Sequence, residues 1–267
     1  MHLVVCVKQV PNPEAAFSML TVDEHAKKVI PAGGLQLVMS PFDEQAVEAA
    51  LRVRESIGEA KITVVSVGPD SARNVLKHAL AMGADEALLI ADEALEDAAS
   101  EATALVLSRA IRNLGTVDLV LTGRQAADWD AGIVGCGIAE LLGLPVVTFA
   151  RKVEVTGPRA RVERVLADGF ETIEADLPAV VTISNELGAA RKPTLRETMR
   201  AARKPLTVKS ASELGLMPAE IGRFSARRVR ERLYVPVRSG RCEIIPGADE
   251  AAQALELARR LRSARLV

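Results

Sequence analysis

The first 150 residues alternate between short apolar runs and amphipathic segments, and this rhythm limits the folds open to the chain. The runs LVVCV (3–7), KITVVSVG (61–68) and ALLI (87–90) are rich in β-branched or aliphatic residues, as in strands buried on both faces. Segments with apolar residues at helical spacing separate them. The alternation predicts a parallel sheet with helices on both of its faces.

The segment after residue 39 shows how local chemistry places the boundaries of one such helix. Ser40 is a suitable N-cap, and Pro41 fits the first helical position because its missing N–H has no partner there. Asp43 and Glu44 complement the positive end of the helix dipole. A later helix is expected over about residues 100–113, ending before Gly115.

From residue 151 the pattern changes to apolar and polar residues in alternation. Turns are expected at Gly157-Pro158 and Asp168-Gly169, which predicts antiparallel strands, and 177–183 is expected to be a final buried strand. We therefore expect an α/β fold: a mostly parallel, doubly wound sheet with helices on both faces, antiparallel additions after residue 150, and an extended C-terminal arm.

Composition narrows the classes of function. The formal net charge of −1, from 34 basic and 35 acidic residues, argues against nucleic acid as the main partner, because such surfaces normally carry a basic excess. No apolar run is long enough for a transmembrane helix, and the N-terminus is typical of a strand rather than a signal peptide. The three cysteines are far apart, so we expect no disulfide framework, no metal site and a cytoplasmic location, with Cys6 and Cys136 as packing residues.

The stretch from Val117 to Ala139 is the first candidate for ligand binding. A short apolar strand is followed by a polar loop containing Gly123 and Gly132, and then by a helix of small residues. The first turn of such a helix offers unpaired backbone N–H groups and partial positive charge, which suit a phosphate. The same pattern also turns the corner of any parallel α/β unit, so it leaves a purely structural role open.

Several segments, taken together and in order, resemble the β subunit of electron transfer flavoprotein. They are VCVKQVPNPE, SPFDEQAVEAALRVRE, VVSVGP, KHALAMGADEALLI, DLVLTGRQAADWD and LPAVVTISNELGAARKPTLRETMRAARKP. The resemblance covers about residues 1–205 and is carried by the combination of motifs. It implies a nucleotide-binding domain of the adenine nucleotide alpha hydrolase-like kind, in an electron carrier subunit that is not an enzyme by itself.

The resemblance also implies partners and cofactors. The chain is expected to form a heterodimer with an α subunit and to pass electrons between a flavin-containing dehydrogenase and a second acceptor. The α subunit would hold most of the electron-transferring FAD. The chain itself would bind a second nucleotide, which is AMP in the simple members and FAD in the electron-bifurcating members of the family.

By position, the resemblance assigns the nucleotide site to strand ends, one helix start and one loop. The residues are Cys6, Val7, Lys8, Ser40, Pro41, Phe42, Asp43, Val67, Gly68, Gly123, Arg124, Gln125, Asp128, Asp130, Ala131, Gly132, Ile133, Val134 and Gly135. Strand ends would form a flat slot for adenine, and N–H groups of the loop would bind phosphate.

The loop has two features that a phosphate site does not explain. Asp128 and Asp130 would repel phosphate, so we expect them either to bind ribose hydroxyls or to cap N–H groups of the loop. Trp129 and Ile133 depart from the family pattern, which usually has Gln at the second position. Isoleucine cannot hydrogen-bond a nucleotide, whereas the Val134-Gly135 pair is more similar to the FAD-binding form than to the AMP-binding form.

Residues 191–204 resemble the recognition loop by which the family docks on dehydrogenases, with Leu195 as the anchor. Leu195 and Met199 are four residues apart and would share one face of a short helix. Basic residues, including Arg191 and Arg196, would surround this apolar pair, which suits transient binding of an acidic partner. The alternative is that both apolar side chains pack on the core.

The tail after the recognition loop has weaker globular character and ends in a strongly charged helix. We expect a nucleotide-binding domain over 1–204, including the recognition loop, and a C-terminal arm over 205–267 that docks on the α subunit.

Two other classes of function fit this sequence less well, although the first of them shares a parallel α/β sheet. An ATP-binding regulatory protein of the universal-stress type would need neither the basic recognition loop nor the tail. An adenylate-forming ligase would need a glycine-rich pyrophosphate loop after the first strand, and VKQVPNP is not one.

Overall fold

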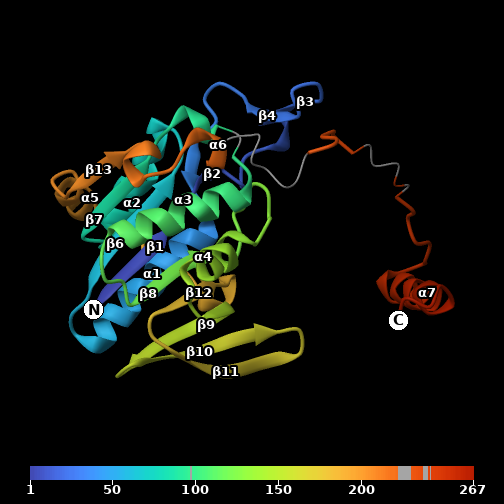
Figure 1. Cartoon of the computed structure of the whole chain (residues 1–267). Coiled ribbons are helices and arrows are strands. Elements are labelled where there is room, and N and C mark those ends of the chain that lie inside the picture. Colours follow the sequence, from blue (N-terminus) through green and yellow to red (C-terminus); the bar gives the residue numbers. More distant parts are fainter. Residues whose placement is uncertain (97, 222–229, 237–239, 241) are drawn as a thin grey trace. The chain divides into compact units, whose positions relative to one another are not determined.

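The computed structural model describes residues 1–96, 98–221, 230–236, 240 and 242–267, which divide into two units (Figure 1). The first unit comprises residues 1–21 and 29–231, and the second comprises 22–28 and 232–267. The first unit contains the sheet and the predicted site, so it is described first.

A nine-stranded sheet forms the centre of the first unit, in the order β11-β10-β9-β12-β8-β1-β6-β7-β13. Its strands are β1 (His2–Cys6), β6 (Lys61–Val67), β7 (Glu86–Ile90), β8 (Leu119–Gly123), β9 (Val146–Thr156), β10 (Arg159–Leu166), β11 (Gly169–Asp176), β12 (Ala179–Ile183) and β13 (Leu206–Lys209). In the part of the sheet that runs β9-β12-β8-β1-β6-β7-β13, every pair of neighbouring strands is parallel. Strand β10 pairs antiparallel with both β9 and β11. The predicted α/β fold with antiparallel additions is confirmed.

Helices cover both faces of this sheet, as the alternation of segments predicts (Figure 1). The helices of the first unit are α1 (Pro41–Ile57), α2 (Arg73–Met82), α3 (Ser100–Asn113), α4 (Val134–Leu142), α5 (Leu195–Ala201) and α6 (Pro218–Ile221), and the second unit contains α7 (Glu250–Ser263). The side chains of α1 and α2 pack in one buried cluster, and those of α3 and α4 pack in a second cluster on the other face. Two small sheets pair β2 (Gln9–Pro11) with β5 (Leu37–Met39), and β3 (Leu20–Asp23) with β4 (Lys28–Pro31).

The order of the strands creates a switch point beside β1. From β1 the chain passes through α1 to β6 and β7 on one side, and later through α3 to β8 on the other. The connections that leave the carboxyl ends of β1 and β8 therefore diverge, which is where ligands bind in open α/β sheets. This places the predicted loop at the edge of the sheet where a crevice is expected.

The main unit continues beyond the boundary expected at residue 204. Strand β13 pairs with β7 at the edge of the sheet, and Leu214, Leu216 and Ile221 are buried in the cluster with α3. These elements are too short to show a period in the sequence, yet each contributes a large apolar side chain to the core. The functional division into domain and arm stays a prediction.

The second unit contains α7, which has no buried residue. The helix begins at an N-cap, Asp249, whose side chain accepts a hydrogen bond from the N–H of Ala252 at 2.8 Å. Leu255 is 74% exposed, and Arg260 pairs with Glu256 one turn earlier. No helix in the part of the chain that the structure describes is both long and apolar enough to span a membrane.

Candidate functional site

The predicted nucleotide-binding segments meet at the carboxyl ends of three adjacent parallel strands. Cys6 at the end of β1 lies opposite Thr122 of β8 on one side and Val65 of β6 on the other. The residues that follow these strands, Lys8 and Gly123 among them, therefore share one edge of the sheet. The start of α1 lies at the same edge and joins the two strand ends.

Asp43, in the first turn of α1, makes this connection. Its carboxylate accepts a hydrogen bond from the N–H of Lys8 at 2.8 Å and another from the N–H of Gly123 at 3.1 Å. The residue is only 6% exposed, and burial raises the pKa of its carboxyl to about 7, against the opposing effect of the two N–H donors. One buried carboxyl thus holds the ends of β1 and β8 at the switch point.

Asp43→Asn is expected to change how stability depends on pH. Because burial raises the pKa of Asp43 from 3.8 to about 7, the folded chain holds this proton more tightly than the unfolded chain does. Its contribution to the free energy of unfolding should fall as pH rises from about 4 to about 7, by on the order of 3 to 4 kcal/mol. The variant should lose this slope, as measured by denaturant unfolding at several pH values.

Asparagine has one oxygen for two N–H donors, so the variant should also be less stable than wild type at pH 5. Glu59→Gln, at an exposed carboxyl, is the matched control and should keep the wild-type slope. An Asp43→Asn chain with an unchanged slope would show that Asp43 does not titrate in this range.

Two glycines of the predicted site are needed for close packing. A Cβ at Gly123 would lie 2.5 Å from Oδ1 of Asp43 and 2.8 Å from Cβ of Phe42. A Cβ at Gly135 would lie 2.7 Å from Oγ1 of Thr122 and 2.7 Å from Cγ2 of Thr182. These contacts set the start of α1 against the end of β8, and the start of α4 against β8 and β12.

Hydrogen bonds within unit 1 hold the loop between β8 and α4 in shape. The N–H of Arg124 donates to the carbonyl of Ile183 at 2.8 Å, and the N–H of Ala127 donates to Oγ of Ser40 at 3.3 Å. Ser40 occupies the N-cap position of α1, but its side chain makes no capping hydrogen bond in that helix and contacts the loop instead. Gln125 Nε2 donates to Oδ1 of Asp130 at 2.8 Å.

The two loop acids have different partners. Asp128 forms an ion pair with Nζ of Lys8 at 2.6 Å and accepts a hydrogen bond from the N–H of Trp129 at 2.9 Å. Asp130 has a φ of 49° and accepts the hydrogen bond from Gln125 described above. Asp128 thus caps an N–H group of the loop, which is one of the two expectations, whereas Asp130 binds a side-chain amide of the loop. Ribose binding stays a prediction for both.

The start of α4 suits an anion. Ile133 stands at the N-cap, and no side chain caps the helix there. As in any α-helix, the backbone N–H groups of the first turn have no intrahelical acceptor, and the helix dipole adds partial positive charge. Gly132, with a φ of 66°, turns the chain into this helix. These backbone N–H groups suit a phosphate even though Ile133 stands where the family pattern usually has a glutamine.

Three residues that contact the loop or its neighbours were not predicted from the sequence: Arg230, Phe149 and Ser184. The guanidinium of Arg230 lies 4.2 Å from the ring centroid of Trp129. Arg124 lies over two rings, 5.0 Å from the centroid of Phe42 and 5.7 Å from that of Phe149, and Nη1 of Arg124 donates to Oγ of Ser184 at 3.3 Å. These contacts join positions far apart in the sequence, so no spacing or motif could have revealed them.

The recognition loop contains the short helix α5, which begins with a capping box between Thr194 and Glu197. Leu195 is 78% exposed and Met199 is 67% exposed, so the alternative that they pack on the core is wrong. Arg196 is also exposed. Arg191 was expected to belong to the basic residues around Leu195 and Met199. Its guanidinium is instead bound by two carboxylates of α1, Glu48 and Glu55.

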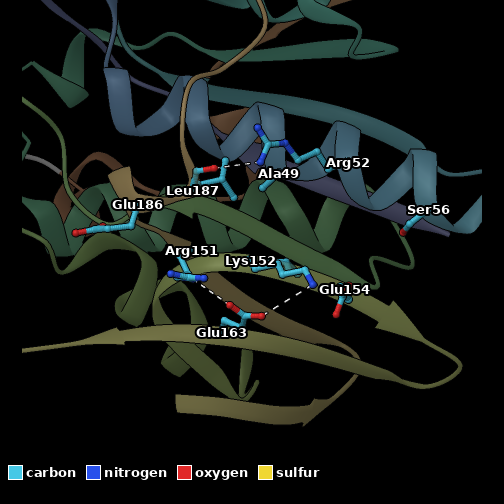
Figure 2. Close-up of a pocket in the computed structure, with 10 residues that line it drawn as sticks. Ala49, Arg52, Ser56, Arg151, Lys152, Glu154, Glu163, Glu186 and Leu187 are labelled. Atoms are coloured by element: carbon cyan, nitrogen blue, oxygen red, sulfur yellow. Dashed lines mark hydrogen bonds and ion pairs between the residues drawn. The ribbon is translucent and has the colours of Figure 1, made fainter. Parts of the chain in front are cut away.

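A cavity of about 560 Å³ lies between α1, the β9–β10 hairpin and residues 186–187 (Figure 2). Three of its charged side chains contact one another: Glu163 binds Arg151 at 3.0 Å and lies 3.9 Å from Nζ of Lys152. Arg52 pairs with Glu48 outside the lining, and Glu186 accepts a hydrogen bond from Oγ of Ser184, so most of the charge around the cavity has a partner within the chain.

Cys6 and Cys136 were both expected to be packing residues, and only Cys6 is buried. Cys6 is buried, and burial raises the pKa of its thiol, as expected of a packing residue. Cys136 on α4 is exposed, so the packing expectation is wrong for it: it lies on the outer face of that helix. Among the described residues, no group of three His, Cys, Asp or Glu side chains could hold a metal ion.

Known proteins are similar to this chain along most of its length. The family described as "Electron transfer flavoprotein domain" matches residues 28–214. The electron transfer flavoprotein subunit beta of Megasphaera elsdenii is 37% identical over 247 residues, which is 90% of each chain. The subunit of the same name from Thermoanaerobacterium thermosaccharolyticum is 40% identical over 223 residues, or 83% of each chain.

A third relative aligns along the full length. The caffeyl-CoA reductase-Etf complex subunit CarD of Acetobacterium woodii is 33% identical over 267 residues, covering 100% of both chains. The family match spans most of the nine-stranded sheet, the loop before α4 and the recognition loop. The chain therefore belongs to the electron transfer flavoprotein family, in which it is a β subunit.

Proposed function

We propose that this subunit binds an adenine nucleotide at the switch point between β1 and β8, and that the nucleotide is FAD. The observation that carries the proposal is the convergence of the uncapped start of α4 with strand ends tied together by Asp43. The resemblance of the Val134-Gly135 pair to the FAD-binding form favours FAD over AMP. A bound flavin would supply the redox chemistry, which no side chain of the site provides.

The residues of the site have distinct proposed roles. Cys6, Val7, Val67 and Gly68, at the ends of β1 and β6, would form the slot for adenine. The N–H groups from Gly132 to Gly135 would bind phosphate oxygens. Asp128 and Lys8, paired at 2.6 Å, would hold the loop closed over the nucleotide or exchange their contact for one with it.

We further propose a heterodimer with an electron transfer flavoprotein α subunit, which would hold the second flavin. The name of the relative CarD places that protein in a reductase-Etf complex. Of the arm predicted over 205–267, residues 206–221 pack in the first unit, so the proposed arm toward the α subunit is 232–267. The exposed apolar residues of α7, such as Leu255, suit a helix that binds another chain.

The face of α5 that carries Leu195 and Met199 is the proposed docking surface for a flavin-containing dehydrogenase. Both side chains are exposed, and the neighbouring Arg196 and Arg200 are basic. A small apolar anchor beside positive charge suits a transient complex with an acidic surface.

Nucleotide content tests the proposed cofactor. The purified heterodimer is denatured, and the released nucleotides are separated and quantified. Two FAD per heterodimer are expected. One FAD with one AMP would assign AMP to this subunit and make the protein a simple carrier. One FAD with no second nucleotide would overturn nucleotide binding by this chain, and tight binding of ATP by a homodimer would favour the regulatory class.

A further inference from the structure

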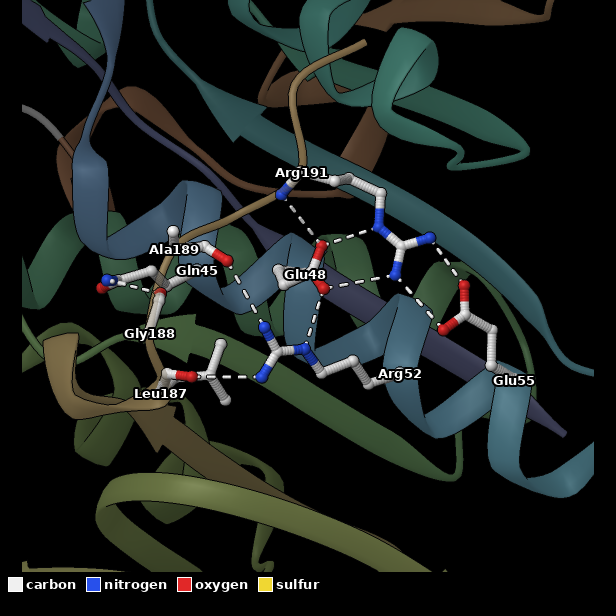
Figure 3. Close-up of polar contacts among 8 residues, drawn as sticks. All are labelled: Gln45, Glu48, Arg52, Glu55, Leu187, Gly188, Ala189 and Arg191. Atoms are coloured by element: carbon white, nitrogen blue, oxygen red, sulfur yellow. Dashed lines mark hydrogen bonds and ion pairs between the residues drawn. The ribbon is translucent and has the colours of Figure 1, made fainter.

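Residues 185–191, which connect β12 to α5, lie along α1 and are held there by side chains of that helix (Figure 3). Four residues of α1 make the contacts, and their spacing of three, four and three places them on one helix face. They are Gln45, Glu48, Arg52 and Glu55.

The backbone of this connection is bound by side chains instead of by a neighbouring strand. Nε2 of Gln45 donates to the carbonyl of Gly188 at 3.1 Å. Arg52 donates from Nη1 to the carbonyl of Leu187 at 3.1 Å and from Nη2 to that of Ala189 at 3.3 Å. The path of the chain toward the docking helix is therefore set by α1.

Arg191 ends this connection with the strongest contacts. Its Nε donates to Glu48 at 2.7 Å, its Nη1 donates to Glu55 at 2.6 Å, and its backbone N–H also donates to Glu48 at 3.2 Å. Nη2 adds a second bond to each carboxylate, at 3.2 Å and 3.3 Å, so both pairs are bidentate. Burial opposes the charge on Glu48, but hydrogen bonds from Arg191 and Arg52 hold the pKa of that carboxyl below its usual value.

The other end of the recognition loop is attached in a similar way to α2. Nζ of Lys204 donates to the carbonyl of Leu80 at 3.0 Å and to the carbonyl of Ala84. The carbonyl of Leu80 lies in the last turn of α2 and that of Ala84 just after the helix, where a cation is also favoured by the helix dipole. A charged side chain thus attaches the chain to a different helix before and after α5.

The helix between these two attachments is short and packs on α2 with one side. It has seven residues, too few to be stable alone in water. Ala201 is its buried residue, while Leu195 and Met199 face solvent. Its orientation is therefore set by its packing on α2 through the side of Ala201 and by the connections at its two ends.

We propose that Arg191 and Lys204 are positioning residues that fix α5 for docking, and that Arg191 is the more important of the two. The inference rests on the proposed docking function of Leu195 and Met199. A helix held in its bound orientation loses less conformational entropy when the dehydrogenase binds, so the attachments raise affinity without contacting the partner. Arg191 thereby belongs to the structure of the docking surface and not to its charged rim.

The test uses the assembled heterodimer and a dehydrogenase isolated by its ability to reduce it. Arg191→Met is expected to raise the KM for the heterodimer about tenfold, a change of about 1.4 kcal/mol, with kcat and flavin content within twofold of wild type. Hydrogen exchange of amides in 192–203 should become at least tenfold faster, while exchange in β1 and β8 stays unchanged. Arg191→Lys should restore only part of the affinity, because lysine cannot bind two carboxylates in the bidentate way.

Arg196→Met is the matched control on α5 itself. Its effect on KM should shrink as salt is added, because an exposed charge acts through a screened field. The effect of Arg191→Met should persist at high salt, since it changes the presentation of the helix. Equal salt dependence for the two variants would assign Arg191 to the rim and overturn the proposal.

Two milder variants cover the case in which Arg191→Met does not fold. Glu55→Gln removes one of the two carboxylates, and Lys204→Met removes the attachment to α2; each should raise KM two- to fourfold and speed exchange in the recognition loop. Unchanged KM and exchange in both would overturn the proposal. Leu195→Ala separates the two hypotheses: if it leaves KM unchanged, the docking function itself fails, whatever the Arg191 variants do.

Discussion

Leu195→Ala in the heterodimer is expected to lower kcat/KM with the dehydrogenase about 30-fold. Leu195 is 78% exposed on a capped helix with no other role in the core, which is typical of an interface anchor. Truncating such an anchor commonly costs about 2 kcal/mol of binding free energy. The loss should be in KM, as measured by steady-state reduction of the heterodimer, and nucleotide content should equal that of wild type.

The control for this result is Met217→Ala, which removes a side chain that is 64% exposed and outside α5. It should leave kcat/KM within twofold of wild type. Met199→Ala, four residues after Leu195, should give a smaller loss of the same kind. Wild-type rates for both α5 variants would remove this helix from the docking surface.

Gly123→Ala is expected to destabilise the chain by about 3 kcal/mol and to lower its nucleotide content at least tenfold. The new Cβ would lie 2.5 Å from Oδ1 of Asp43 and 2.9 Å from the backbone carbonyl carbon of Phe42, so α1 must shift. Overpacking of this kind typically costs 1–3 kcal/mol or more. The shift would also break the contact that ties β8 to β1, which is why both stability and binding should fall.

Denaturant unfolding and quantification of released nucleotide measure the two effects. Gly33→Ala is the matched control, because a Cβ there meets no atom within 4 Å. It should leave both quantities unchanged. If Gly123→Ala behaves like Gly33→Ala, the start of α1 is not packed against β8 as tightly as the structure indicates.

Most of the element boundaries in the α/β region could be predicted, because they depend on neighbours in the sequence. The helix expected over 100–113 is α3 (Ser100–Asn113), and Pro41 begins α1 as its fixed φ requires. Strand β13 could not be predicted, because four residues carry no recognisable period and its pairing with β7 is a long-range choice.

The roles of individual side chains were harder to predict from the sequence. Asp43 is recognisable in the sequence as a first-turn acid, but its bonds to Lys8 and Gly123 join positions 35 and 80 residues away. Arg191 is recognisable as a basic residue near an exposed leucine, and only the position of α1 shows that its charge is already bound.

The sequence by itself determined the family, the alternation of strands and helices, and the segments that form the candidate site. Each of these follows from local propensity, from hydrophobic period or from a motif in continuous sequence. The tertiary structure alone decided which atoms meet: Asp43 with two strand ends, Arg230 with Trp129, and Arg191 with two carboxylates. Such contacts depend on packing between distant elements, whose geometry no local pattern specifies.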